Sequence, residues 1–76
     1  MATKHDLTEW VIEGLNALGG EGNVAEIAQE IWERHEDDLR ASGTLFYTWQ
    51  YDMRWAGQNL QKAGKLTKLY RSWRLK

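Results

Sequence analysis

One side of the segment 45–63 carries side chains whose chemistry suits contact with the edges of DNA bases. If the apolar residues turn inward, a period of about 3.6 residues leaves the opposite face to the polar ones. That face consists of Tyr47, Tyr51, Arg54, Gln58 and Lys62, with Gln61 beside it. Arg can donate to O6 and N7 of guanine together, and Gln can pair in the same bidentate way with adenine. Arg54 and Gln58 stand one helical turn apart, so both are candidates for direct contact with bases.

Other residues of this face suit the DNA backbone, and the start of the helix affects which of them meet bases. Tyr47 and Lys62 fit phosphate or sugar contacts, which fix register without reading sequence, and Tyr51 fits either role. Either Thr44 or Thr48 can cap a helix here. If the helix starts near Thr48, Gln50 and Tyr51 occupy its first turn, the part that usually approaches base edges. The alternative is a face that is only solvated or that contacts a protein, since nearly every amphipathic helix has a polar side.

Two amphipathic helices are predicted ahead of this segment. The first covers residues 5–18, with the apolar stripe Leu7, Trp10, Val11, Leu15 and Leu18. Gly19 and Gly20 end it, because glycine accepts the left-handed backbone that closes a helix. Asn23 and Glu26 have the spacing of a capping box, so the second helix is predicted to start at Val24. Its stripe is Val24, Ile27, Ala28 and Ile31, and it fades through Trp32 into the charged run 33–38, with Leu39 anchoring its end or a following turn.

A break at residues 41–44 precedes the third helix, and a hairpin follows it. The buried stripe of the third helix is Leu45, Trp49, Met53, Ala56, Leu60 and Ala63, and Gly64 is its predicted stop. Residues 65–70 and 72–76 predict the two strands of a β-hairpin. If Trp73 faces the core, alternation turns Arg74 outward, beside Lys68 and Arg71 of the same hairpin. These bases would contact phosphates flanking the groove, or they would protect an exposed strand against edge-to-edge aggregation.

The charge of the chain is divided unequally between its two halves. The net charge of the whole chain is −1. Residues 1–43 hold three bases against ten acids, a net charge of −7, whereas residues 44–76 hold seven bases against one acid, a net charge of +6. Such asymmetry within one domain indicates that one face meets a polyanion while the other stays in solvent.

Length and composition exclude several classes of protein. Seventy-six residues, 42% of them apolar, fit one small domain. The absence of cysteine excludes disulfides, thiol nucleophiles and zinc ribbons, and makes a reducing cytoplasm the expected location. The longest uncharged stretch, residues 41–51, is far shorter than the roughly 20 apolar residues of a membrane span, and residues 1–6 lack the apolar core of a secretion signal. No phosphate loop, dinucleotide fingerprint or nucleophile motif is present, so neither an enzyme nor a cofactor is expected.

The aromatic and acidic residues outside the polar face have structural interpretations. Trp10, Trp49 and Trp73 lie on apolar stripes and are expected in the core. Trp32 and Trp55 lie off their stripes. Each is expected either to be half-buried and support the packing of its helix, or to form part of a dimer or partner surface. Stacking of single-stranded bases on the tryptophans is a lesser alternative. The acidic run 36–38 beside His35 lacks the spaced oxygens and glycine of a calcium loop, which favours a solvated helix end without a metal.

The order of elements is that of a winged helix-turn-helix domain, and a family resemblance agrees with it. The string DMRWAGQNLQKAGKL at residues 52–66, with Trp73-Arg74-Leu75 near the end of the chain, resembles the N-terminal winged-helix domain of Mrr-type restriction proteins. An Arg-Trp-Ala, a Leu, a Lys-Ala-Gly and a final Trp-x-Leu occur there in the same order, and Leu-x-x-Leu-Gly-Gly at residues 15–20 is similar to the end of that family's first helix. Those relatives have a longer, glycine-bearing wing tip. The nuclease domain that follows in them is not in this sequence, so the resemblance implies no cleavage activity.

The sequence therefore predicts a mainly α (α+β) winged helix-turn-helix domain over residues 1–76, with three helices and a C-terminal β-hairpin wing. The expected function is binding of double-stranded DNA in a regulatory role, with the third helix in the major groove and the hairpin on the backbone. The alternative is a protein-interaction or dimerisation module that uses Tyr51, Trp55 or Trp32 on the same scaffold, because fold alone does not decide function.

Overall fold

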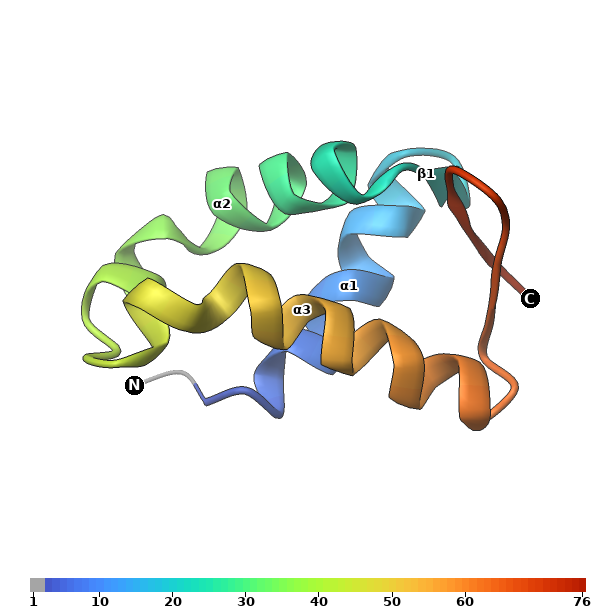
Figure 1. Ribbon diagram of the computed structural model, residues 1–76. Helices are drawn as coiled ribbons and strands as arrows, with labels where there is room; N and C mark the ends of the chain where they lie inside the picture. Colours follow the sequence, from blue (N-terminus) through green and yellow to red (C-terminus); the bar gives the residue numbers. More distant parts are fainter. Residues whose placement is uncertain (1–2) are drawn as a thin grey trace.

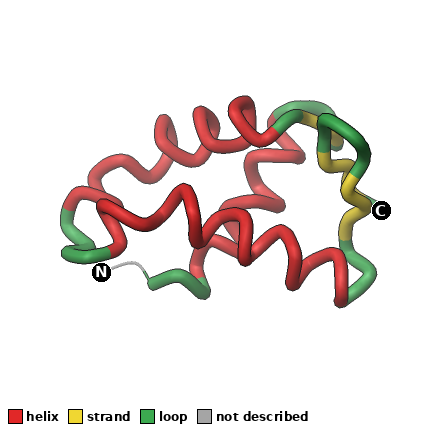
Figure 2. The backbone as a smooth tube through the Cα atoms, in the orientation of Figure 1, coloured by secondary structure: helices red, strands yellow, loops and turns green. Residues whose placement is uncertain are grey.

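Three helices and a small antiparallel sheet make up the part of the chain that the structure describes, residues 3–76 of a computed structural model. The helices are α1 (Asp6–Ala17), α2 (Val24–Arg40) and α3 (Leu45–Lys62), and the strands are β1 (Glu21–Gly22), β2 (Leu66–Lys68) and β3 (Trp73–Leu75). α2 and α3 lie next to each other with α1 behind them, and the strands gather at one end of the molecule (Figures 1 and 2). The predicted α+β arrangement of three helices and a C-terminal hairpin is confirmed.

Local signals in the sequence account for the junction between α1 and α2. Gly19 and Gly20 follow α1 with φ of 83° and 99°, values that glycine adopts without steric cost. The capping box is present: the Asn23 side chain accepts a hydrogen bond of 2.8 Å from the Glu26 backbone N–H, and the Glu26 carboxylate accepts one of 3.0 Å from the Asn23 backbone N–H. Two backbone donors at the start of α2 are thereby satisfied.

α2 continues beyond its apolar stripe, through the charged run 33–38, to Arg40. Its backbone is irregular at His35. Leu39 is completely buried, so the last turn is attached to the core. Glu36 also accepts a hydrogen bond of 2.7 Å from Arg40 one turn later. Tertiary contact therefore extends a helix that its own sequence pattern supports poorly.

The sheet has a third strand that the sequence analysis missed. Its order is β1-β3-β2, so β3 lies between two antiparallel neighbours. In the predicted hairpin, Leu66 stands opposite Leu75 and Lys68 stands opposite Trp73. β1 adds the pairs Glu21 with Arg74 and Gly22 with Trp73. The end of the hairpin is thereby joined to the turn that precedes α2.

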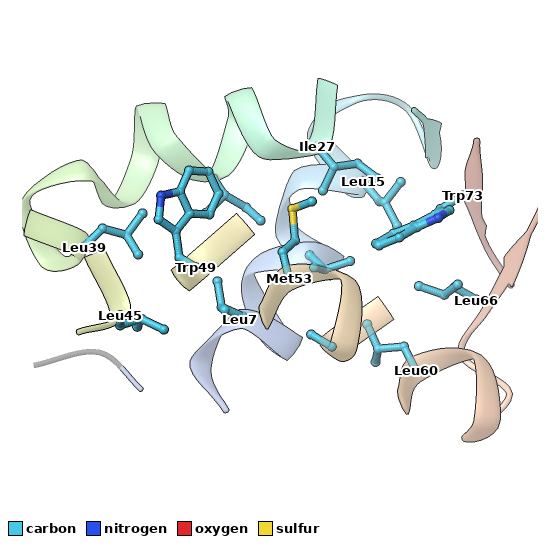
Figure 3. Close-up of a cluster of buried hydrophobic side chains, with 13 residues drawn as sticks. Leu7, Leu15, Ile27, Leu39, Leu45, Trp49, Met53, Leu60, Leu66 and Trp73 are labelled. Carbon is cyan, nitrogen blue, oxygen red and sulfur yellow. The ribbon is translucent and has the colours of Figure 1, made fainter. Parts of the chain in front are cut away.

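The core lies where the three helices meet the hairpin. Its buried apolar residues are Leu7, Val11, Leu15, Ile27, Ile31, Leu39, Leu45, Trp49, Met53, Ala56, Leu60, Leu66 and Trp73. Figure 3 shows Trp49 and Trp73 toward opposite ends of this cluster with Met53 between them. Both tryptophans were predicted in the core, which is confirmed.

Several residues of the predicted stripes are less buried than expected. Leu18, Val24 and Ala28 are partly buried and pack against the core. Trp10 is only partly buried, because its ring stacks on that of His35 with the centroids 3.9 Å apart instead of entering the core. Ala63 is exposed, because α3 ends at Lys62 and Gly64 follows with φ of 77°. The core stripe of α3 therefore stops at Leu60.

Two glycines inside helices are expected to respond oppositely to alanine. A Cβ on Gly57 would lie 2.5 Å from Cζ3 of the Trp73 ring, whereas one on Gly14 would meet its nearest neighbour, Cβ of Glu30, at 3.4 Å. We expect Gly57→Ala to lower the free energy of unfolding by about 1–2 kcal/mol, because overpacking exceeds the gain in helix propensity. Gly14→Ala should raise it by about 0.5–1 kcal/mol. Thermal unfolding of both variants checks the signs, and a stabilised Gly57→Ala would contradict the packing of Trp73 on α3.

Candidate nucleic-acid interface

The polar face of α3 begins earlier than one interpretation of the sequence assumed. The helix starts at Leu45, with Thr44 at its N-cap position and making no side-chain cap. Thr48 lies inside the helix and donates a hydrogen bond of 2.8 Å to Asp52. Gln50 and Tyr51 therefore lie in the second turn, not the first as a start near Thr48 would require. The first turn contributes Tyr47.

All six site residues predicted on this helix are exposed. They are Tyr47, Gln50, Tyr51, Arg54, Gln58 and Lys62. Tyr47 and Tyr51 have 83% and 78% of their surface in solvent. Within residues 3–76, neither Arg54 nor Lys62 takes part in an ion pair. The face thus presents two unpaired cations and two side-chain amides, a combination able to bind phosphates and base edges.

The hairpin places Lys68 differently from the prediction. Residues directly opposite each other in an antiparallel pair share a face of the sheet, so Lys68 lies on the face of Trp73 and not beside Arg74. Its ammonium is 5.0 Å from the centre of the Trp73 ring, and that ring contacts α3 at Gly57. Lys68 is therefore on the side of the hairpin that faces α3.

Arg74 is the predicted site residue whose charge is neutralised. It is exposed as predicted, but it donates a hydrogen bond of 2.9 Å to Glu21 of β1. Ser72 donates to the other oxygen of the same carboxylate at 3.0 Å. Arg74 is therefore engaged within the sheet, and its predicted contact with a phosphate would require breaking this pair. The carboxylate comes from the strand that the sequence analysis did not predict.

The tip of the hairpin carries an exposed cation beside an aromatic ring. Arg71 is exposed, and its guanidinium lies 5.2 Å from the centre of the Tyr70 ring. Tyr70 is 92% exposed and Leu69 is 37% exposed. Neither residue was among the predicted site residues, although their place in a short turn was a signal of exposure. The wing tip thus exposes apolar side chains and a cation that are available to a binding partner.

The division of charge in the sequence persists in the folded chain. In the part of the chain that the structure describes, the bases of the second half without an ion pair are Arg54, Lys62, Lys65, Lys68, Arg71 and Lys76. By contrast, Arg34 pairs with Glu30, and Arg40 pairs with Glu36. The cations of α2 are therefore neutralised locally, whereas those of α3 and the wing are not.

The two tryptophans that lie off the apolar stripes are partly covered by contacts within the chain. Trp55 meets the ring of His5 edge-on at 5.6 Å between centroids, and the ammonium of Lys4 lies 4.8 Å from its ring. Trp32 stacks on Trp49 with the ring centroids 6.0 Å apart. Both are half-buried, as props would be.

Glu21 gives the sheet a dependence on pH with a defined sign. Hydrogen bonds from Arg74 and Ser72, together with the charge of Arg74, lower the pKa of the Glu21 carboxyl below its ordinary value of 4.5. Stability contributed by a carboxyl whose pKa is lowered on folding is present above the unfolded pKa and is lost as the pH falls through the folded pKa. We therefore expect Glu21→Gln to remove part of the loss of stability below about pH 4.5, measured by urea unfolding across pH. If the free energy of unfolding of Glu21→Gln falls below pH 4.5 as steeply as that of the unchanged protein, the pairing of Glu21 with Arg74 is contradicted.

Comparisons with known proteins add no family to this geometry. Searches against protein-family models, curated proteins and solved structures each found no match for the chain. Within residues 3–76, none of the helices has the length and apolar character needed to cross a bilayer.

Proposed function

We propose that this protein binds double-stranded DNA, with the exposed face of α3 in the major groove and the wing against the backbone. The observation that supports this most directly is the set of unpaired cations on α3 and on the wing, on a chain whose other cations are mostly neutralised. A groove lined with phosphates attracts such a surface, and the acidic first half would be repelled to the far side.

The residues of the surface divide into two roles. Arg54 and Gln58 lie one turn apart on the exposed face and are suited to bidentate contact with guanine and adenine. Tyr47, Tyr51, Lys62 and the wing bases Lys68 and Arg71 are suited to phosphates and sugars. In this arrangement Arg74 contributes nothing while Glu21 neutralises it. The proposed role is regulatory, and the proposed location is the cytoplasm, where a chain without cysteine is expected.

Salt dependence tests this proposal. About three phosphate contacts, from Lys62, Lys68 and Arg71, give a slope of roughly −2.7 for log K against log salt concentration. Affinity for a duplex should then fall about fortyfold when the salt concentration rises fourfold. Fluorescence anisotropy with a labelled duplex of mixed sequence measures this slope. A duplex that does not bind even at low salt, or a slope near zero, would remove the proposal.

The alternative is a module that binds a protein or a second copy through the same face. It predicts that Arg54→Ala leaves partner binding largely intact, whereas the DNA proposal predicts a loss. Sedimentation of the free protein over a range of concentrations tests the dimeric version of this alternative.

A further inference from the structure

A groove between α2 and α3 is lined without a single charged side chain. Its volume is about 590 Å³, within the range of roughly 300–1,000 Å³ typical of sites for small molecules. Trp32, Phe46 and Trp49 provide three aromatic rings along it, and Ala25 and Ala28 leave room between the helices. In a chain with 28% charged residues, an uncharged aromatic lining favours a neutral, flat ring.

The groove continues toward the exposed face of α3. A second hollow of about 460 Å³ adjoins the first, because Ala25, Ala28 and Gln50 line both, and the two hollows together are called the groove. This second part ends at Arg54. The groove extends along α2 from Val24 to Trp32, which at 1.5 Å per residue is about 12 Å. One end is therefore aromatic, with the guanidinium of Arg40 5.2 Å from the centre of the Trp32 ring and neutralised by Glu36, and the other end carries the unpaired guanidinium of Arg54.

The guanidinium end favours an anionic group on the occupant. Arg54 is exposed and forms no ion pair among residues 3–76. Neither hollow is lined by Asp or Glu, so no carboxylate of the groove competes for it. Arg binds a carboxylate through two parallel hydrogen bonds. The amides of Gln29 and Gln50 offer further hydrogen bonds in the uncharged part.

We propose that this groove is a binding site for an aromatic carboxylate about 12 Å long, with its ring system against Trp32 and Phe46 and its carboxylate on Arg54. Occupation of Arg54 by the acid would remove a base-contacting side chain from the DNA surface, so the acid would compete with DNA. This competition rests on the proposed function, whereas binding of the acid does not.

Two probes with the same rings separate the contribution of the charge. Biphenylcarboxylate fits the length of the groove, and biphenylcarboxamide is its neutral counterpart. We expect the acid to shift the NMR signals of the Trp32 and Trp49 indoles and of the Arg54 side chain, and to bind about tenfold more tightly than the amide. Arg54→Gln should weaken binding of the acid about tenfold and leave binding of the amide unchanged.

A second variant tests the position of the site without removing a core residue. Ala25 lines both parts of the groove and is exposed, so Ala25→Leu should fill the groove, leave the fold intact and weaken both probes. Ala17→Leu, at an exposed alanine of α1 that lines neither part, is the matched control and should change nothing. Equal affinity for acid and amide, no effect of Arg54→Gln, or no binding of either probe would each overturn the proposal.

Addition of a duplex distinguishes failure of this proposal from failure of the proposed function. If biphenylcarboxylate binds as expected and no duplex does, the carboxylate site stands and the DNA proposal fails. If the duplex binds and the acid gives no shifts, the carboxylate site fails alone. If both bind, the acid should reduce the affinity for the duplex, and independent binding would overturn the assignment of Arg54 to the acid.

Discussion

Replacing Trp73 with alanine is expected to lower the free energy of unfolding by about 3–5 kcal/mol. The ring is 5% exposed, it stands on the central strand of the sheet, and it contacts α3 at Gly57. A chain of 76 residues has a total stability of about 4–11 kcal/mol, so the variant should be close to unfolding at room temperature. Urea denaturation followed by circular dichroism measures the loss.

Tyr70→Ala provides the matched control within the same hairpin. Tyr70 is 92% exposed, and its contact with Arg71 is at the surface. Its removal should change the free energy of unfolding by no more than about 0.5 kcal/mol. If Trp73→Ala and Tyr70→Ala unfold at the same urea concentration, the wing is not attached to α3 through the indole ring.

Arg54→Ala is expected to weaken binding to a preferred duplex by about 1–3 kcal/mol, which is about five- to 150-fold in affinity. The side chain is exposed and unpaired, so stability should be nearly unchanged. Loss of a bidentate contact with guanine should also relax the preference for that base. Anisotropy titrations with duplexes that differ at one base pair measure both effects.

Arg34→Ala is the control for charge. It removes the same charge from α2, where the guanidinium is paired with Glu30. Since the loss of a charge alone acts on all duplexes equally, Arg34→Ala should change the affinity little and the base preference not at all. Equal losses from the two variants would mean that net charge, and not the face of α3, determines binding.

The helices could be predicted because their signals are local. The capping box of Asn23 and Glu26 and the glycines after α1 determine helix ends through residues a few positions apart. β1 could not be predicted in this way, since Glu21–Gly22 is too short for an alternating pattern. It exists because β3 offers it a pairing edge from 51 residues further along the chain.

The same distinction between local signals and long-range pairing explains which parts of the candidate site could be predicted. Helical periodicity was sufficient to predict the exposed face of α3, because each residue there is placed by its neighbours in the helix. The roles of Lys68 and Arg74 depend on strand register and on β1, which are set by pairing across the sheet. Alternation along β3 correctly predicted that Arg74 is exposed. It gave no information on the carboxylate of Glu21, which lies on the neighbouring strand β1.

The central position of β3 has a consequence for the order in which the molecule forms during translation. β1 precedes α2 in the chain, yet its only neighbour in the sheet is β3, whose residues Trp73–Leu75 come more than fifty positions later. Contacts so distant in sequence form slowly, after the local helices. Consider a nascent chain that is stalled on the ribosome before Trp73 has emerged. We expect its helical segments to form but to remain open to cleavage by proteases. The chain should become resistant to proteases only when β3 is released.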